Sequence, residues 1–144
     1  MQIIQLDSYT IVGSQISLDD ITKKNFRNFN AIIIARPEGE DLGQPTFANI
    51  KLISNGIGVK VYQVPVVSGK ITEEDVQAFE ALTNKESGPV FIYCRMGHRA
   101  ASFWAIIKPR RGFLAKELLY IAKKAGYDLP YLAPKFAANF FKKL

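Results

Sequence analysis

Cysteine and histidine are almost absent from this chain of 144 residues, which contains one of each. A single cysteine excludes an intramolecular disulfide, and with it the reduction of an oxyanion through an internal dithiol. The chain also lacks the clustered Cys and His ligands of a structural zinc site. We therefore expect no metal and no other cofactor. A thiol that stays free is typical of a reducing compartment, so we expect a cytoplasmic location.

Long apolar stretches are missing as well. No run approaches the roughly 20 apolar residues of a membrane-spanning helix. Residues 2–7 have neither the basic region nor the apolar core of a signal peptide. The sequence therefore predicts no membrane span and no signal peptide. Hydrophobic residues at 48% and charged residues at 22% are ordinary for a globular protein, and we expect residues 1–144 to form a single domain.

The net charge of +6 is distributed unevenly. From Lys108 onward nine basic residues stand against Glu117 and Asp128, so this segment carries +7 and the preceding 107 residues carry −1. A basic segment can bind nucleic acid, anionic lipid or an acidic partner. Because no aromatic residues alternate with the lysines in a nucleic-acid-binding pattern, we interpret the segment as a solvated helix face and expect no nucleic-acid partner.

Segments typical of strands and helices alternate along the chain. The runs 31–35 and 89–93 are uniformly apolar, as in strands covered on both faces, and 59–64 alternates as a strand does. We expect helices beginning at Ser17 and Thr72, and others at 45–55, 100–107, 113–125 and near 136–144, with Pro109 interrupting the chain. This order predicts an α/β fold with a mainly parallel central sheet flanked by helices, and ligands at the carboxyl ends of its strands.

The motif Cys94-Arg95-Met96-Gly97-His98-Arg99 follows the 89–93 strand and precedes a helix. Unpaired N–H groups and the dipole of the helix N-terminus favour an anion there, and a thiol in such a place is largely thiolate near neutral pH. Gly97 allows the short loop to close, and Arg99 offers a planar fork of donors. We predict an anion-binding loop with Cys94 as nucleophile and Arg99 as its partner; the alternative is a buried structural cysteine.

Further candidate residues lie near this loop. Because His98 belongs to the loop, where side chains point outward, we expect it at the rim; a Cys–His dyad is the alternative. The acids Glu38, Glu40 and Asp41 follow the 31–35 strand and should emerge at the same edge of the sheet. Arg36 is a candidate second cation. A solvated loop in which Arg36 pairs with a neighbouring acid fits the sequence equally well.

From about residue 10 to residue 129, the chain resembles the phosphatase-like domain of beta-lactamase hydrolase-like proteins, a bacterial group. The resemblance rests on segments 12–15, 34–45, 64–66, 71–76, 88–99 and 125–129. It implies a protein tyrosine phosphatase-like α/β fold of the dual-specificity kind. Because such domains have been labelled both phosphatases and sulfurtransferases, the resemblance leaves the reaction open.

Two features of the sequence favour sulfur transfer. Tyrosine phosphatases resemble one another in having five residues between cysteine and arginine, which would place the arginine at Ala100. Here four residues separate Cys94 from Arg99, as in a rhodanese loop, and the tighter ring suits a persulfide better than a phosphate. The loop 65–70 also contains no carboxylate to serve as the general acid of a phosphatase.

We therefore expect a sulfurtransferase that carries sulfane sulfur as a persulfide on Cys94. It would take the sulfur from a small anionic donor, thiosulfate or a persulfide, and pass it to a thiol acceptor or to cyanide. The alternative is a phosphatase that cleaves a phosphate ester through a phosphocysteine, with Glu40 or Asp41 as acid. A non-catalytic anion- or partner-binding module is a third interpretation, against which the intact Cys94 and Arg99 argue.

Overall fold

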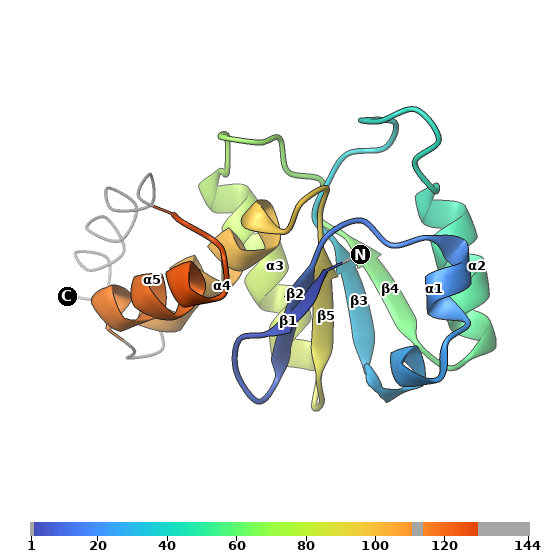
Figure 1. The fold of residues 1–144 in the computed structure, drawn as a ribbon, viewed down its shortest axis with the longest axis horizontal. Coiled ribbons are helices and arrows are strands. Elements are labelled where there is room, and N and C mark those ends of the chain that lie inside the picture. The colour runs from blue at the N-terminus through green and yellow to red at the C-terminus, as the bar shows by residue number, and fades with distance from the viewer. Residues whose placement is uncertain (1, 111–113, 130–144) are drawn as a thin grey trace.

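The structure is a computed structural model that describes residues 2–110 and 114–129 (Figure 1). These residues form one sheet with helices on both sides. In chain order the elements are β1 (Ile3–Gln5), β2 (Thr10–Gly13), α1 (Leu18–Ile21), the 3₁₀ helix η1 (Lys24–Asn28), β3 (Ala31–Ile34), α2 (Phe47–Gly56), β4 (Lys60–Gln63), α3 (Glu73–Lys85), β5 (Val90–Tyr93), α4 (His98–Arg110) and α5 (Ala115–Lys124).

The strands follow the order β1-β2-β5-β3-β4 across the sheet. β5 runs parallel to both neighbours, with Val90 opposite Thr10 of β2 and opposite Ala31 of β3, and β3 runs parallel to β4. β1 alone among the described strands is antiparallel, at the edge beside β2. The predicted α/β fold with a mainly parallel sheet is thereby confirmed. The β1–β2 pair was not predicted from the sequence.

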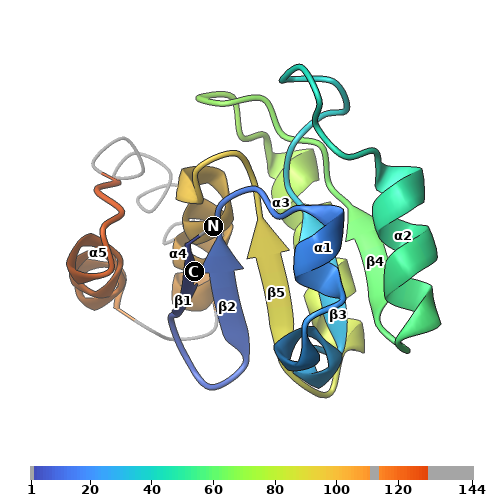
Figure 2. The same ribbon diagram turned by 45° about the vertical axis from the view of Figure 1, so that its right-hand side comes forward.

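The central strands are buried on both faces, which explains their uniformly apolar sequences. Helices α1 and α2 cover one face and α3 and α4 cover the other, while α5 packs against α4 (Figures 1 and 2). Successive residues of β3 and β5 alternate between two hydrophobic clusters. On the α2 side lie Ile32, Ile34, Phe91 and Tyr93; on the α4 side lie Ile33, Val90, Ile92 and Cys94.

The two helix starts predicted from Ser and Thr are confirmed as capping boxes. Ser17 accepts a hydrogen bond from the backbone N–H of Asp20, and the Asp20 carboxylate accepts one from the backbone N–H of Ser17. Thr72 and Asp75 form the same pair at the start of α3. Each box satisfies backbone donors that the helix itself leaves unpaired.

Other helix boundaries differ from the prediction. Helix α2 begins at Phe47 rather than at Pro45, because the Thr46 side chain accepts from the backbone N–H of Asn49 and caps the helix there. Pro109 does not end the preceding helix but lies within α4, one residue before its end.

The last predicted helices are only partly tested. Helix α5 begins at Ala115, whereas Phe113 and the predicted segment 136–144 lie outside the described residues. No helix in the described ranges has the length and apolar character needed to cross a membrane.

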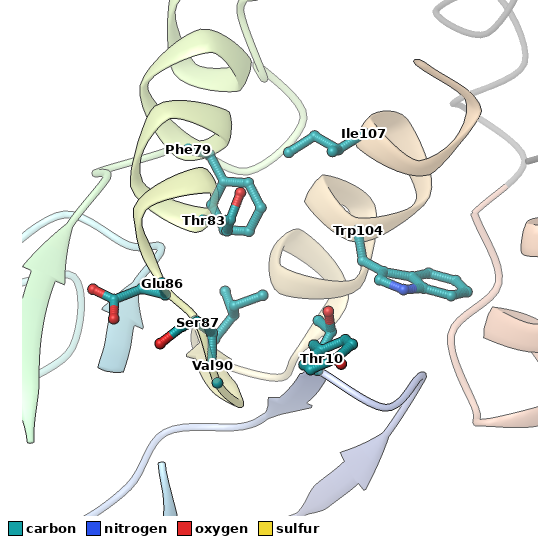
Figure 3. A pocket seen from close by; sticks show the side chains of 11 residues that line it. Thr10, Phe79, Thr83, Glu86, Ser87, Val90, Trp104 and Ile107 are labelled. Carbon is teal, nitrogen blue, oxygen red and sulfur yellow. The ribbon is translucent and has the colours of Figure 1, made fainter. Parts of the chain in front are cut away.

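A cavity of about 260 Å³ lies between α3 and α4, beside the amino ends of β2 and β5 (Figure 3). Its walls include the rings of Phe79 and Trp104, and the Glu86 side chain extends away from both rings. The Glu86 carboxylate accepts a hydrogen bond of 3.1 Å from the Tyr62 hydroxyl and lies 3.7 Å from Lys60 Nζ. Because Cys94 follows the carboxyl end of β5, this cavity lies at the opposite edge of the sheet from the cysteine loop.

Candidate active site

Three loops meet at the carboxyl edge of the sheet, where the parallel strands end. They are the cysteine loop after β5, the loop 35–46 after β3 and the loop 64–72 after β4 (Figures 1 and 2). Together they enclose a cavity of about 390 Å³, and all three contribute side chains to its wall. The lining residues are Glu40, Asp41, Ser68, Cys94, Arg95, Met96, His98 and Arg99.

Cys94 lies at the base of this cavity, between β5 and the first residue of α4. Its side chain is buried, and the backbone N–H of Gly97 donates a hydrogen bond of 3.1 Å to its Sγ atom. Helix α4 begins at His98, in the same loop as Cys94. The unpaired N–H groups of its first turn are therefore close in sequence to Cys94. The predicted strand–loop–helix setting of Cys94 is confirmed.

Gly97 takes a backbone conformation that side chains disfavour, with φ at 105°. A Cβ atom at this position would also overlap the hydroxyl of the buried Tyr127. The loop therefore needs glycine for two reasons, backbone conformation and close contact. Tyr127 is a support of the loop that the sequence analysis did not identify.

Replacing Gly97 by alanine is expected to lower the free energy of unfolding by about 2–4 kcal/mol, from backbone strain plus overlap with Tyr127. Gly58→Ala is the matched control, because Gly58 also has positive φ, 79°, but has no atom within 4 Å of the added Cβ. We expect the control to lose about 1 kcal/mol. Urea unfolding of both variants measures the difference, and equal losses would show that the Tyr127 contact is unimportant.

Arg99 is bound from two sides. Its Nη1 and Nη2 atoms donate hydrogen bonds of 2.9 Å to the two carboxylate oxygens of Glu40, and Nη1 also donates to the carbonyl oxygen of Val66 at 2.8 Å. Burial alone would lower the pKa of Arg99, but the Glu40 hydrogen bonds and the nearby Cys94 outweigh it and raise that pKa. Arg99 is thus a fixed cation beside Cys94.

Arg36 holds the acidic loop in place rather than reaching the cavity. Its guanidinium is buried and donates to Glu40 at 2.8 Å and to Asp41 at 2.9 Å, while a third bond of 2.8 Å reaches the side chain of Gln15. Of the two interpretations of Arg36, the structure therefore matches the one in which it pairs with neighbouring acids. This network fixes the Glu40 carboxylate against Arg99.

Replacing Arg36 by methionine is expected to destabilise the fold by about 2–3 kcal/mol. Removing one partner of a buried ion pair usually lowers the free energy of unfolding by more than this. Here the loss is smaller because the Glu40 and Asp41 side chains are 25% and 40% exposed and can be rehydrated. Lys23→Met is the control, because Lys23 is 66% exposed and pairs with Asp20 at the surface. Urea unfolding should show a change of about 0.5 kcal/mol or less for the control; similar losses in both variants would contradict this account.

Of the remaining candidate residues, Asp41, Arg95, Met96 and His98 line the cavity, and Glu38 does not. The Asp41 carboxylate also accepts from Arg95 Nε at 3.0 Å, and the exposed Met96 and His98 lie at the rim, as predicted for His98. Glu38 instead accepts a hydrogen bond from the backbone N–H of Phe47 at the start of α2. It is therefore a helix-capping residue and does not line the cavity.

The two acids at the cavity are held ionised. For Glu40, burial alone would raise the pKa, but hydrogen bonds from Arg99 and Arg36 outweigh it and lower the pKa below its ordinary value. For Asp41, the hydrogen bond from Arg36 lowers the pKa, helped by the charge of Arg95. Among the described residues, no group of three or more His, Cys, Asp or Glu side chains is arranged to hold a metal ion.

Several residues of the site were not identified from the sequence. Gln44 accepts hydrogen bonds from the backbone N–H groups of Glu40 and Asp41, and so shapes the acidic loop. Ser68 and the Val66 carbonyl come from the loop after β4, where the sequence indicated only the lack of a carboxylate. Gln15 lies in segment 12–15, one of the segments on which the family resemblance rests. That resemblance was the only indication in the sequence that Gln15 belongs to the site.

Comparison with known proteins identifies the family. The model of the phosphatase-like domain of beta-lactamase hydrolase-like protein matches residues 4–110. This chain belongs to that family. It is 28% identical over 130 residues to the beta-lactamase hydrolase-like protein of Agrobacterium fabrum, covering 90% of this chain and 30% of that relative, and equally so to the one of Xylella fastidiosa. The chain thus spans less than a third of the length of these relatives.

Solved structures agree with the family. A protein of Neisseria meningitidis named as a candidate phosphatase superposes with a TM-score of 0.83 at 28% identity, over 96% of this chain and 99% of that one. The catalytic core of Siw14, a PP-IP phosphatase of Saccharomyces cerevisiae, has the same fold, with a TM-score of 0.69 at 17% identity over 95% and 82% of the two chains. The protein tyrosine phosphatase-like fold is confirmed.

These findings contradict the predicted sulfurtransferase. The family and the structures that match are phosphatase-like, so the hydrolase, the stated alternative, is the better supported enzyme class. Two physical reasons explain the error. The shorter spacing from Cys94 still leaves Arg99 beside the sulfur, and the carboxylates that the loop 65–70 lacks are supplied by Glu40 and Asp41 from the loop after β3.

Proposed function

We propose that this domain hydrolyses phosphate monoesters through a phosphocysteine on Cys94. The observation that carries the proposal is one cavity that contains Cys94, Arg99 and two carboxylates. A thiolate, a forked cation and an acid are the groups that this reaction needs. The thiolate attacks phosphorus, the cation binds the nonbridging oxygens, and the acid protonates the departing alkoxide or phenolate.

Each group has a distinct role in the proposal. The backbone N–H groups of the cysteine loop and the Arg99 guanidinium bind the phosphoryl oxygens and stabilise the charge that they carry in the transition state. A hydrogen bond to the Val66 carbonyl anchors Arg99 in the wall of the cavity. Glu40 and Asp41 lie in the same cavity wall and are the candidate acids.

The substrate is a phosphate ester that enters the cavity past a rim of exposed side chains. Met96 is 62% exposed and Arg95 has a side chain 62% exposed. A nucleophile that is a free thiol works best where thiols stay reduced, so we place the domain in the cytoplasm.

The direct test is a comparison of reactions catalysed by the purified domain. We expect release of inorganic phosphate from an aryl phosphate, and no transfer of sulfur from thiosulfate to cyanide. Arsenate and vanadate, which resemble phosphate in shape and charge, should inhibit. Sulfur transfer without phosphate release would contradict the proposal.

A further inference from the structure

The guanidinium of Arg99 is already bound to a carboxylate in the position where we expect a phosphoryl group. Nη1 and Nη2 bond the two oxygens of Glu40 at 2.9 Å each, the two-point pairing that arginine also forms with phosphate. A phosphoryl group that binds this side of Arg99 must displace Glu40. We propose that Glu40 is the general acid, and that it takes up its proton when the substrate displaces it from Arg99. This inference rests on the proposed function.

The two oxygens of Glu40 are held differently. Oε1 accepts a hydrogen bond from Arg36 Nε at 2.8 Å as well as from Arg99, whereas the donor to Oε2 is Arg99 Nη1. Arg36 is buried and is itself held by Asp41 and Gln15. When a phosphoryl group takes Arg99, Glu40 therefore remains tethered through Oε1. Oε2 then loses the donor that it has in the free protein, Arg99 Nη1, so it is the oxygen that can carry a proton to the substrate.

The charges around Glu40 explain why a proton follows the substrate. The charged and titratable groups that face the cavity or bind Glu40 are Arg36, Arg95, Arg99, Asp41, Cys94 and His98. Three of these groups are arginines, and two are the carboxylates of Glu40 and Asp41. A phosphate monoester dianion adds two negative charges beside Glu40. It also removes the Arg99 hydrogen bonds that keep the Glu40 pKa low, so both effects raise that pKa.

The reaction balances with Glu40 in this role. In the first step the Cys94 thiolate attacks phosphorus, the P–O bond to the leaving group breaks, and the Oε2 proton passes to the departing oxygen. The products are phosphocysteine, the alcohol or phenol, and ionised Glu40. In the second step water attacks phosphorus and gives one proton to Glu40. The P–S bond breaks, and the thiolate and hydrogen phosphate are released.

The proposal predicts how anion binding depends on pH. In the free protein Glu40 is ionised at neutral pH, because its pKa is lowered. If the bound anion raises that pKa, binding takes up a proton, and affinity weakens as pH rises between the two pKa values by up to about tenfold per pH unit. Glu40→Gln has no proton to take up, so its affinity should not follow this slope.

The test uses sulfate, a tetrahedral dianion that does not titrate in this range, and the Cys94→Ser background, which removes the thiol. Calorimetry in two buffers of different ionisation enthalpy at pH 6–8 measures proton uptake. We expect uptake rising toward about one proton per sulfate at the lower pH, and none when Glu40→Gln is added. Asp41→Asn and His98→Gln are the controls and should retain the uptake. Uptake that persists without Glu40, or no uptake at all, would overturn the proposal.

Kinetics separate this inference from the proposed function. In the otherwise wild-type domain, Glu40→Gln should lower kcat/KM, which reports the steps up to formation of phosphocysteine, by about 10²–10⁴ for an alkyl phosphate. It should lower kcat/KM much less for an aryl phosphate, whose leaving group needs little protonation. A residue that only shaped the loop would slow both substrates alike. If hydrolysis depends on Cys94 but sulfate binding takes up no proton, Glu40 is not the general acid, and the proposed hydrolysis through Cys94 is still supported. Absence of Cys94-dependent hydrolysis, or of sulfate binding, refutes both.

Discussion

Replacing Cys94 by serine is expected to abolish hydrolysis of phosphate monoesters, with a loss in kcat of at least about 10⁴-fold. The Sγ atom of Cys94 lies beside the Gly97 N–H and precedes the start of α4, and a thiol is a much stronger nucleophile than a hydroxyl. A serine hydroxyl at the same place does not ionise at neutral pH and would need a general base. Phosphate release from an aryl phosphate by both proteins measures the effect.

The control for this experiment is anion binding by the same variant. Serine has nearly the shape of cysteine, so the loop and Arg99 should remain in place and sulfate should still bind. A variant that binds sulfate but does not turn over supports Cys94 as nucleophile. A serine variant with near wild-type turnover would show that another group attacks phosphorus.

Replacing Arg99 by lysine is expected to lower kcat by about 10²–10³ although the positive charge is kept. An ammonium group cannot bond two phosphoryl oxygens and the Val66 carbonyl in the planar geometry that the guanidinium has. The loss should appear at saturating aryl phosphate, because the interaction strengthens in the transition state. Steady-state kinetics measure kcat and KM separately.

Arg95 provides the matched comparison, because it belongs to the same loop but has an exposed side chain that pairs with Asp41. Arg95→Ala should mainly raise KM, since a rim cation attracts the substrate without touching the reacting atoms. Equal losses of kcat in both variants would mean that the two arginines have been assigned wrongly. Slight effects in both would mean that the loop N–H groups hold the phosphoryl group alone.

The position of Cys94 followed from local sequence. The apolar run before Cys94 predicted a strand buried on both faces, and the apolar residues after Arg99 predicted a buried helix. These two elements place the cysteine at the carboxyl edge of the sheet without any knowledge of the rest of the chain. The short β1–β2 hairpin has three- and four-residue strands and gave no comparable signal.

The residues that surround Cys94 are brought together by contacts between distant parts of the chain. Glu40 and Arg99 are 59 residues apart, and the sequence indicated only that both loops leave the same edge of the sheet. A hydropathy pattern also does not predict that Arg36 is buried. Its guanidinium can be buried because it forms three hydrogen bonds at once, to Glu40, Gln15 and Asp41. The predicted sulfurtransferase was wrong because the spacing between Cys94 and Arg99 does not determine which groups line the cavity. The loop after β3 supplies its two carboxylates.

The most direct test of the account is the identity of the covalent intermediate. The wild-type domain is mixed with an aryl phosphate, denatured within its first turnovers and examined by intact mass and peptide mapping. We predict one phosphoryl group on Cys94, absent from Cys94→Ser and enriched in Glu40→Gln, because loss of the base slows hydrolysis of the intermediate. Release of phosphate by the wild type with no phosphoryl group on Cys94 in either active protein would contradict the account.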